Sequence, residues 1–214
     1  FGDKDWFVVD DILTLQEQND IGNLLTSNYF PWYLSEYYTV SKEHHDKFKH
    51  FLNVKEHIQM VHQFYMARDE DPEYKTEAVS DRKEIIDLLV KKIAKYLKKD
   101  KLVLARAKAN LQHNVTGNKK EYFNTPHVDE PSLKHWVCIY YLNDSDGDTL
   151  FFEGDEETAV KKKELKIIHS VSPKKGRFLF FKGSLKNFKA KMIIPTKAIY
   201  DPAINSLSKG PANL

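Results

Sequence analysis

The second half of the chain is a series of short apolar runs separated by turn residues. The runs cover residues 136–142, 149–153, 165–171, 177–181 and 191–200. Glycine-containing turn signals lie at residues 146–147, 154–155, 175–176 and 182–183. An earlier run at 102–111 alternates with a period of two, which predicts a strand. Several short strands at this spacing are typical of a sandwich or jelly roll.

The first hundred residues have a different, mainly helical pattern. Residues 13–25, 54–66 and 81–97 place apolar side chains at helical spacing. Thr14 and Ser80 are candidate N-caps for the first and the last of these segments. Two shorter runs in this half, at 6–12 and 30–40, have the composition of strands.

These patterns predict a mainly β protein with helices, of the α+β class. We expect one domain over residues 1–214, in which a mainly helical part (1–100) packs on a β core (101–200) and an irregular tail (201–214) follows. The chain is 41% hydrophobic and 30% charged, which excludes an intrinsically disordered protein.

Three features bear on the compartment. No apolar run approaches the ~18 residues needed to cross a bilayer, so we expect no membrane partner. A single cysteine, Cys138, excludes an internal disulfide and favours a reducing compartment. Residues 1–5 are polar and lack a signal-peptide pattern. We therefore expect a cytoplasmic protein, although the missing initiator Met leaves a removed leader open.

Charge is distributed unevenly. Residues 144–157 hold seven acids and no Lys or Arg, whereas residues 160–200 hold twelve Lys or Arg and one acid. The basic stretch is either a set of solvated strand faces or a surface that attracts an anionic substrate. It is also the only support for a nucleic-acid substrate, such as a methylated base.

The segment Asn124-Thr125-Pro126-His127-Val128-Asp129 contains the strongest chemical signal. In a strand, residues i and i+2 point to the same face, so His127 and Asp129 would project together, about 6.6 Å apart along the strand. An imidazole and a carboxylate, completed by a second His, form the facial triad that holds non-haem iron(II). A lone His-X-Asp recurs by chance, so the surrounding sequence has to support it.

The residues that follow supply this support. Downstream come Ile-Tyr-Tyr-Leu-Asn at 139–143, Gly-Asp-Thr at 147–149 and Pro-Lys-Lys-Gly-Arg at 173–177, which leads into an aromatic run. In this order the motifs resemble the prolyl-4-hydroxylase-like branch of the iron(II)- and 2-oxoglutarate-dependent dioxygenases. They also look like uncharacterised members encoded by tailed phages, which would place the protein in the host cytoplasm. The resemblance covers roughly residues 102–200.

The resemblance implies a double-stranded β-helix (jelly roll) core, with His127 and Asp129 as the first two metal ligands. It also implies iron(II) and the co-substrates 2-oxoglutarate and O2, and leaves ascorbate open as an accessory reductant. Tyr141 matches a position whose hydroxyl meets the far carboxylate of 2-oxoglutarate, and Lys191 stands where the family has a basic residue for the co-substrate. A peptide or prolyl substrate is favoured.

One part of the family pattern is missing. The family expects a distal His soon after the aromatic run, but residues 182–194 contain none, and Asn187 or Lys189 stands near that place. The spacing back from Lys191 suggests that several residues have been lost after Phe181. The alternative to an active dioxygenase is thus a β-helix module that has lost its distal ligand and serves a binding or structural role.

The other histidines lack ligand-like spacing. We expect His113, His135 and His169 to be structural or surface residues. We expect those of the N-terminal half to be solvated, namely His44, His45, His50, His57 and His62.

Overall fold

The computed structural model describes residues 5–35, 40–54, 59–67, 76–112, 122–128, 135–183 and 189–190. Within these residues it has four helices, α1 (Leu15–Leu25), α2 (Lys42–Phe48), α3 (Glu84–Tyr96) and α4 (Glu156–Lys162). The strands are β1 (Trp6–Val9), β2 (Tyr33–Leu34), β3 (Gln59–Ala67), β4 (Thr76–Ala78), β5 (Ala107–Gln112), β6 (Trp136–Tyr140), β7 (Thr149–Phe152), β8 (Ile167–Val171), β9 (Phe178–Lys182) and β10 (Lys189–Ala190).

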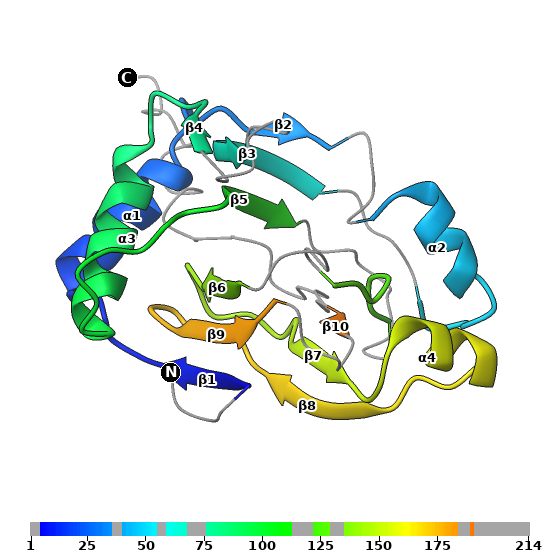
Figure 1. Cartoon of the computed structure of the whole chain (residues 1–214). Helices are drawn as coiled ribbons and strands as arrows, with labels where there is room; N and C mark the ends of the chain where they lie inside the picture. The colour runs from blue at the N-terminus through cyan, green and yellow to red at the C-terminus, as the bar shows by residue number, and fades with distance from the viewer. Residues whose placement is uncertain are drawn as a thin grey trace, which may run out of the picture.

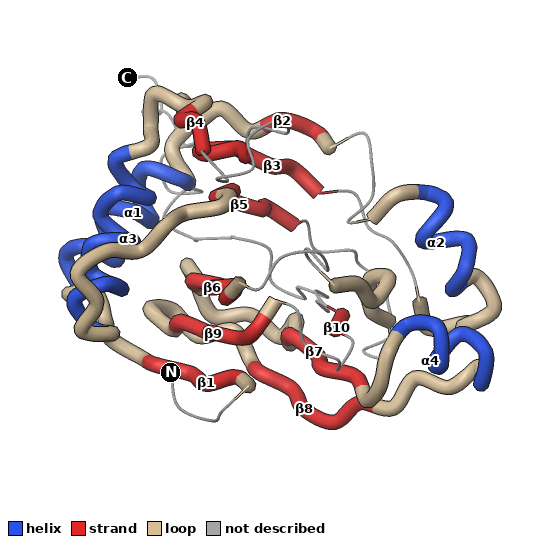
Figure 2. The backbone as a smooth tube through the Cα atoms, in the orientation of Figure 1, coloured by secondary structure: helices blue, strands red, loops and turns tan. Residues whose placement is uncertain are grey.

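The strands form three antiparallel sheets (Figures 1 and 2). In the first, β9 lies between β1 and β6, so the N-terminal strand pairs with one near the end of the β region. In the second, β7 lies between β10 and β8. In the third, β3 pairs along one edge with β5 and along the other with β2 and β4.

Strands β7 and β9 are buried on both faces, which explains their continuous apolar sequence. On β9, Leu179 and Phe181 join Phe151 and Val171 in a cluster between the first two sheets. These sheets therefore pack face to face.

Helices pack against both sheets, and the layer over β9 also includes third-sheet residues, namely Phe64, Tyr65, Ala107 and Ala109. Phe178 and Phe180 of β9 contact a cluster that includes residues of α1 and α3, while Leu150 and Phe152 of β7 contact a cluster with residues of α2 and α4. Figure 1 shows the two helix pairs at opposite ends of the molecule. Burial of one phenylalanine side chain contributes roughly 1.5–3 kcal/mol, so these layers account for much of the stability.

Local sequence signals explain how several elements begin. Thr14 caps α1 through a capping box, in which its side chain accepts from the Glu17 amide and the Glu17 carboxylate accepts from the Thr14 amide. Asp155 caps α4 by accepting from the Thr158 amide at 2.8 Å. Gly176, in the turn before β9, has φ +82°, a conformation that favours glycine. The predictions of the Thr14 cap and of this turn are confirmed.

The predicted mix of strands and helices is confirmed, but two N-terminal elements differ. The helix predicted at 54–66 is wrong, because β3 occupies 59–67. In β3, His62 and Phe64 are two residues apart and both buried. Because histidine counts as a polar residue in the sequence pattern, the alternation typical of a strand was not recognised. The helix predicted at 81–97 is α3, but it starts at Glu84, and Ser80 instead accepts from the Arg82 amide. Helices α2 and α4 were not predicted.

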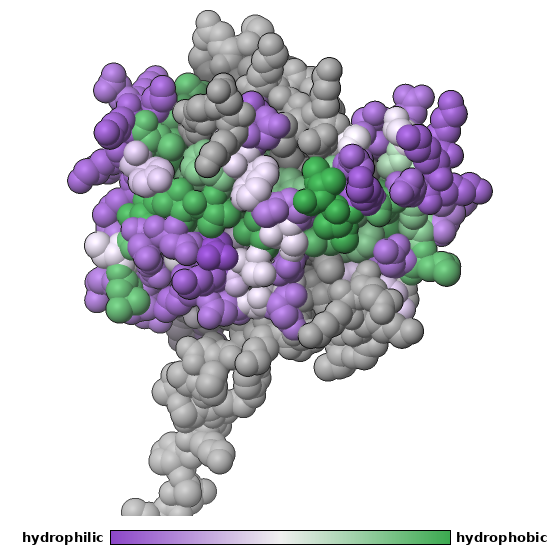
Figure 3. Space-filling view, turned by 90° about the horizontal axis from the view of Figure 1, so that it is seen from below, coloured by the Kyte–Doolittle hydropathy of each residue, from purple (hydrophilic) through white to green (hydrophobic). Residues whose placement is uncertain are grey.

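The view from below shows apolar surface across the middle of that face, with hydrophilic side chains on either side (Figure 3). Ile167 and Ile168 of β8 are about half exposed. Among the described residues, no helix is long and apolar enough to cross a membrane.

Candidate metal and co-substrate site

The segment that leads to His127 is anchored by Phe123. The Phe123 amide donates to the carbonyl of Asn53 at 3.0 Å, and Phe123 forms a parallel bridge with Val54. Its ring packs on Phe152 of β7, with the centroids 5.2 Å apart. The next three residues are fully buried, namely Asn124, Thr125 and Pro126. The backbone before the motif is thus fixed on the outer side of β7.

His127 is half-buried, and its ring is oriented by the backbone two residues earlier in the chain. Its Nδ1 lies 3.1 Å from the carbonyl oxygen of Thr125. A carbonyl can only accept, so Nδ1 carries the proton and the lone pair of the neutral ring is at Nε2. This is the arrangement found in metal-bound histidines, in which the second ring nitrogen donates to a carbonyl or carboxylate.

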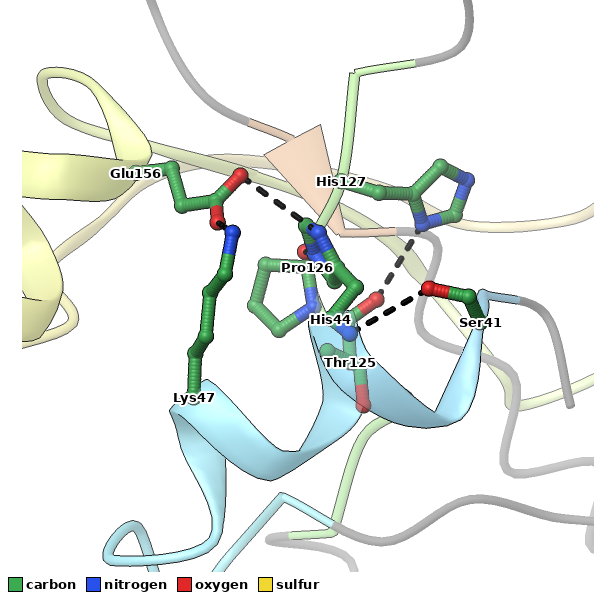
Figure 4. A network of polar contacts seen from close by, with 7 residues as sticks. All are labelled: Ser41, His44, Lys47, Thr125, Pro126, His127 and Glu156. Carbon is green, nitrogen blue, oxygen red and sulfur yellow. Dashed lines mark hydrogen bonds and ion pairs between the residues drawn. The ribbon is translucent and has the colours of Figure 1, made fainter.

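Two histidines of α2 contact the residues just before His127. His44 donates from Nε2 to the carbonyl of Pro126 at 2.8 Å, and Nδ1 of His45 lies 2.7 Å from the Thr125 hydroxyl. Figure 4 shows His44 between Pro126 and Glu156. The prediction that these two histidines are solvated is therefore wrong.

Glu156 of α4 connects the two helices on this side. Its carboxylate lies 3.5 Å from Nδ1 of His44 and accepts from the Lys47 ammonium at 3.1 Å (Figure 4). Such a half-exposed ion pair adds little stability alone. Together with the His44 contact, however, it fixes how α2 lies against α4 beside the motif.

Asn124 is fully buried, yet neither polar atom of its side-chain amide has a hydrogen-bond partner within the described part of the chain. A buried amide without partners costs about 1–3 kcal/mol, so such groups are rare unless a bound group or water satisfies them. It lies three residues before His127. A bound group or water that reaches this segment would satisfy the amide.

Tyr141 follows β6 and is buried in the cluster between the two sheets. Its hydroxyl lies 2.7 Å from the Thr149 hydroxyl, and burial raises the pKa of the phenol to about 12. The phenol is therefore neutral at physiological pH and can donate a hydrogen bond. Its backbone is fixed by the turn before β9, because the Tyr141 amide donates to the Arg177 carbonyl and the Gly176 amide donates to the Tyr141 carbonyl.

Arg177 ties this turn to the end of β1. Its guanidinium donates to both carboxylate oxygens of Asp10, at 2.8 and 3.0 Å, and to the Ser172 carbonyl at 3.0 Å. These hydrogen bonds hold the pKa of the Asp10 carboxyl below its usual value. The turn behind Tyr141 is thus held by a bidentate pair as well as by backbone contacts.

The other histidines divide between structural and exposed roles. His62 is buried and contacts the Pro31 carbonyl and the Ser80 hydroxyl, each at 2.7 Å, so the prediction that it is solvated is also wrong. His169 stacks on the Trp6 ring with the centroids 3.7 Å apart, and burial lowers its pKa, which confirms a structural role. His50 is exposed, as predicted.

Several predicted site residues lie outside the described residues, namely Asp129, Asn187 and Lys191. Their placement relative to His127 and Tyr141 remains a prediction. His57 and His113 also lie outside the described residues, so the roles predicted for them remain predictions. The backbone of Lys189, the alternative at the distal position, belongs to β10 and pairs with Phe151 of β7.

The sequence did not reveal the contribution of α2, α4 and Asn124. The contacts of His44 and His45 span 82 and 80 residues, and no local pattern encodes such a distance. A helix start was readable, because Ser41 caps α2 by accepting from the His44 amide at 3.2 Å. That signal places a helix at 42–48 but does not say what it packs on.

No family model matches the chain, and no curated protein matches it. Among solved structures, it is similar to an oxidoreductase of the 2OG-Fe(II) oxygenase family from Burkholderia pseudomallei. The TM-score is 0.57 at 10% identity, over 88% of this chain and 79% of that one. A prolyl-4-hydroxylase from Pseudomonas putida aligns over 89% of this chain and 87% of its own, with a TM-score of 0.44 at 14% identity.

At such identity a structural likeness establishes the fold and not the activity. The resemblance indicated by the sequence motifs is therefore confirmed in the fold, and the chain shares the fold of the 2OG-Fe(II) oxygenase from Burkholderia pseudomallei.

Proposed function

We propose that this chain is a non-haem iron(II)- and 2-oxoglutarate-dependent dioxygenase with a double-stranded β-helix core. The observation that carries the proposal is the ring of His127, whose Nδ1 donates to the Thr125 carbonyl so that the lone pair lies at Nε2. Asp129 follows two residues later and would supply the carboxylate of the same metal. The clusters that join helices and strands support one domain for the described residues.

The residues around the motif suit a bound metal and co-substrate. His127 offers a nitrogen donor of the correct tautomer, and the buried amide of Asn124 lacks a partner among the described residues. A bound metal with its co-substrate or water would bring hydrogen-bonding groups to this region. Bound iron(II) with 2-oxoglutarate and O2 would supply the oxidising chemistry, and the protein would supply orientation and a dry site.

Tyr141 and Lys191 are the proposed co-substrate residues. The Tyr141 phenol stays neutral to about pH 12 and can donate to a carboxylate without adding charge to the site. Lys191 would provide the positive charge that a dicarboxylate requires. The substrate is a peptide, with a prolyl side chain as the first candidate, because the sequence resembles the prolyl-4-hydroxylase-like branch.

A second candidate function rests on one observation, the absence of histidine from residues 182–194. An asparagine is a weak iron ligand and a protonated lysine is none. The chain would then be a binding or structural module that keeps the fold and lacks turnover. Weak iron binding without 2-oxoglutarate turnover would support this alternative.

The test is succinate formation by the full chain, loaded with iron(II) under anaerobic conditions and then given 2-oxoglutarate and air. We expect iron-dependent succinate that His127→Ala abolishes and His50→Ala, an exposed control, leaves unchanged. No succinate from the loaded chain would overturn the proposed activity. The third ligand is tested by Asn187→His, which should tighten Mn(II) binding at least about tenfold if Asn187 occupies the distal position. Tightening by Lys189→His instead would move the distal position to Lys189.

A further inference from the structure

We propose that His44 and His45 are positioning residues for the metal motif, which they hold through Thr125 and Pro126. The inference rests on the proposed function and adds a part to its site. Neither residue belongs to the sequence motifs that carry the resemblance, since α2 lies in the part of the chain that those motifs do not cover.

The two histidines add hydrogen bonds to a buried stretch that lies outside the strands. Residues 124–126 are fully buried but belong to no strand, so they lack the ladder hydrogen bonds of a sheet. Pro126 has no amide hydrogen, and its carbonyl accepts from His44 Nε2 at 2.8 Å. The Thr125 hydroxyl pairs with His45 Nδ1 at 2.7 Å.

Helix α2 is itself held firmly enough to act as a support. Ser41 caps its first turn, and the buried Phe48 at its last turn packs in the same cluster as Phe152 of β7. Glu156 reaches from α4 to both His44 and Lys47. The rings therefore project from a helix that is fixed at its start, its end and its side.

The geometry makes His44 a support and not a metal ligand. Its Nε2 donates a hydrogen to a carbonyl, so this nitrogen has no lone pair to offer a metal. The effect on the metal is transmitted by Thr125, because the Thr125 carbonyl accepts from Nδ1 of His127 and so sets the direction of that ring. Loss of a direct partner of a ligating histidine typically lowers metal affinity by about 10–100-fold, and His44 and His45 act one contact further out.

The experiment measures Mn(II) binding to the full chain from the EPR signal of free Mn(II), without co-substrate and without turnover. We expect His44→Ala and His45→Ala to weaken binding by up to about tenfold, the lower end of the range for direct partners of a ligand. His44→Gln keeps an N–H at the ε position and should restore most of the affinity. His50→Ala, an exposed histidine just after α2, is the matched control and should bind as the wild type does.

A double-mutant cycle separates positioning from general loss of packing. Thr125→Val removes the hydroxyl with little change of shape, so it should weaken binding as His45→Ala does, and the double variant should lose little more. Thermal unfolding of each variant shows that the fold is kept.

Unchanged affinity in both alanine variants would overturn the inference and leave the proposed function standing. Equal losses in His44→Ala and His44→Gln would also overturn it, because they would point to ring packing. A wild-type chain that binds no Mn(II) would overturn the metal site itself, and the inference with it.

Discussion

Replacing Phe152 by alanine should remove a large part of the stability of this protein. The side chain is fully buried between β7 and the helices α2 and α4, and its ring packs on Phe123. Truncation of a buried phenylalanine costs about 3–5 kcal/mol, since contacts are lost and a cavity remains. A domain has roughly 5–15 kcal/mol in total. At this chain length the loss corresponds to a fall in Tm of roughly 6–20 °C.

Urea unfolding followed by far-UV circular dichroism measures this loss. Tyr29→Ala is the control, because that ring is 91% exposed and its removal should change the free energy of unfolding by less than about 0.5 kcal/mol. If Phe152→Ala shifts the urea midpoint no more than Tyr29→Ala does, the packing described for this layer is wrong.

The same variant should also affect the metal motif. Phe152 contacts Phe123, which anchors the segment before His127, and shares a cluster with Phe48 of α2. We therefore expect weaker Mn(II) binding in Phe152→Ala at temperatures where the protein is still folded. Ile93→Ala, in the cluster of α1 and α3 on the other side of the molecule, should destabilise the fold without weakening binding. Equal weakening in both variants would refute a local connection.

Three further changes have defined outcomes. Gly176→Ala should destabilise the fold by about 1–3 kcal/mol in urea unfolding, because φ is +82° and an added Cβ meets a buried glutamine amide. Gly154→Ala, with φ +80° but open space, should cost less, and the reverse order would contradict this. Arg177 lowers the pKa of Asp10, so the ionised carboxylate stabilises the fold by about 1 kcal/mol above pH 3.8, the ordinary pKa of Asp. This contribution should be lost as the pH falls below 3.8, and Asp10→Asn should lack it at any pH. Tyr141→Phe should lower the free energy of unfolding by about 1 kcal/mol, because the hydrogen bond to Thr149 is lost. It should also weaken 2-oxoglutarate binding in calorimetry, while Mn(II) binding stays the same.

Much of the β region could be predicted because its signals are local. Strands β7 and β9 are buried on both faces, so each is a short apolar run, and turns such as Gly176 mark where they begin. The Thr14 capping box is also contained in four residues.

The remainder depends on which distant segments meet. The sequence predicts a helix where β3 lies, because His62 counts as polar although hydrogen bonds satisfy it in the interior. It predicts solvated side chains for His44 and His45, because their partners lie about 80 positions away. Within the site, the motif indicates His127, whereas the packing of α2 on the residues before it is visible only in the folded chain.

The pairing of β1 with β9 has a consequence during synthesis. Trp6 pairs with Phe181, roughly 175 residues later, so the first strand leaves the ribosome long before its partner exists. At about 5–20 residues per second this interval is on the order of 9–35 s. Throughout it the Trp-Phe-Val-Val sequence of β1 lacks its partner strand β9, although α1 and α3 are made earlier. The first sheet can therefore close only after β9 has been synthesised, and until then β1 is an apolar strand without its partner.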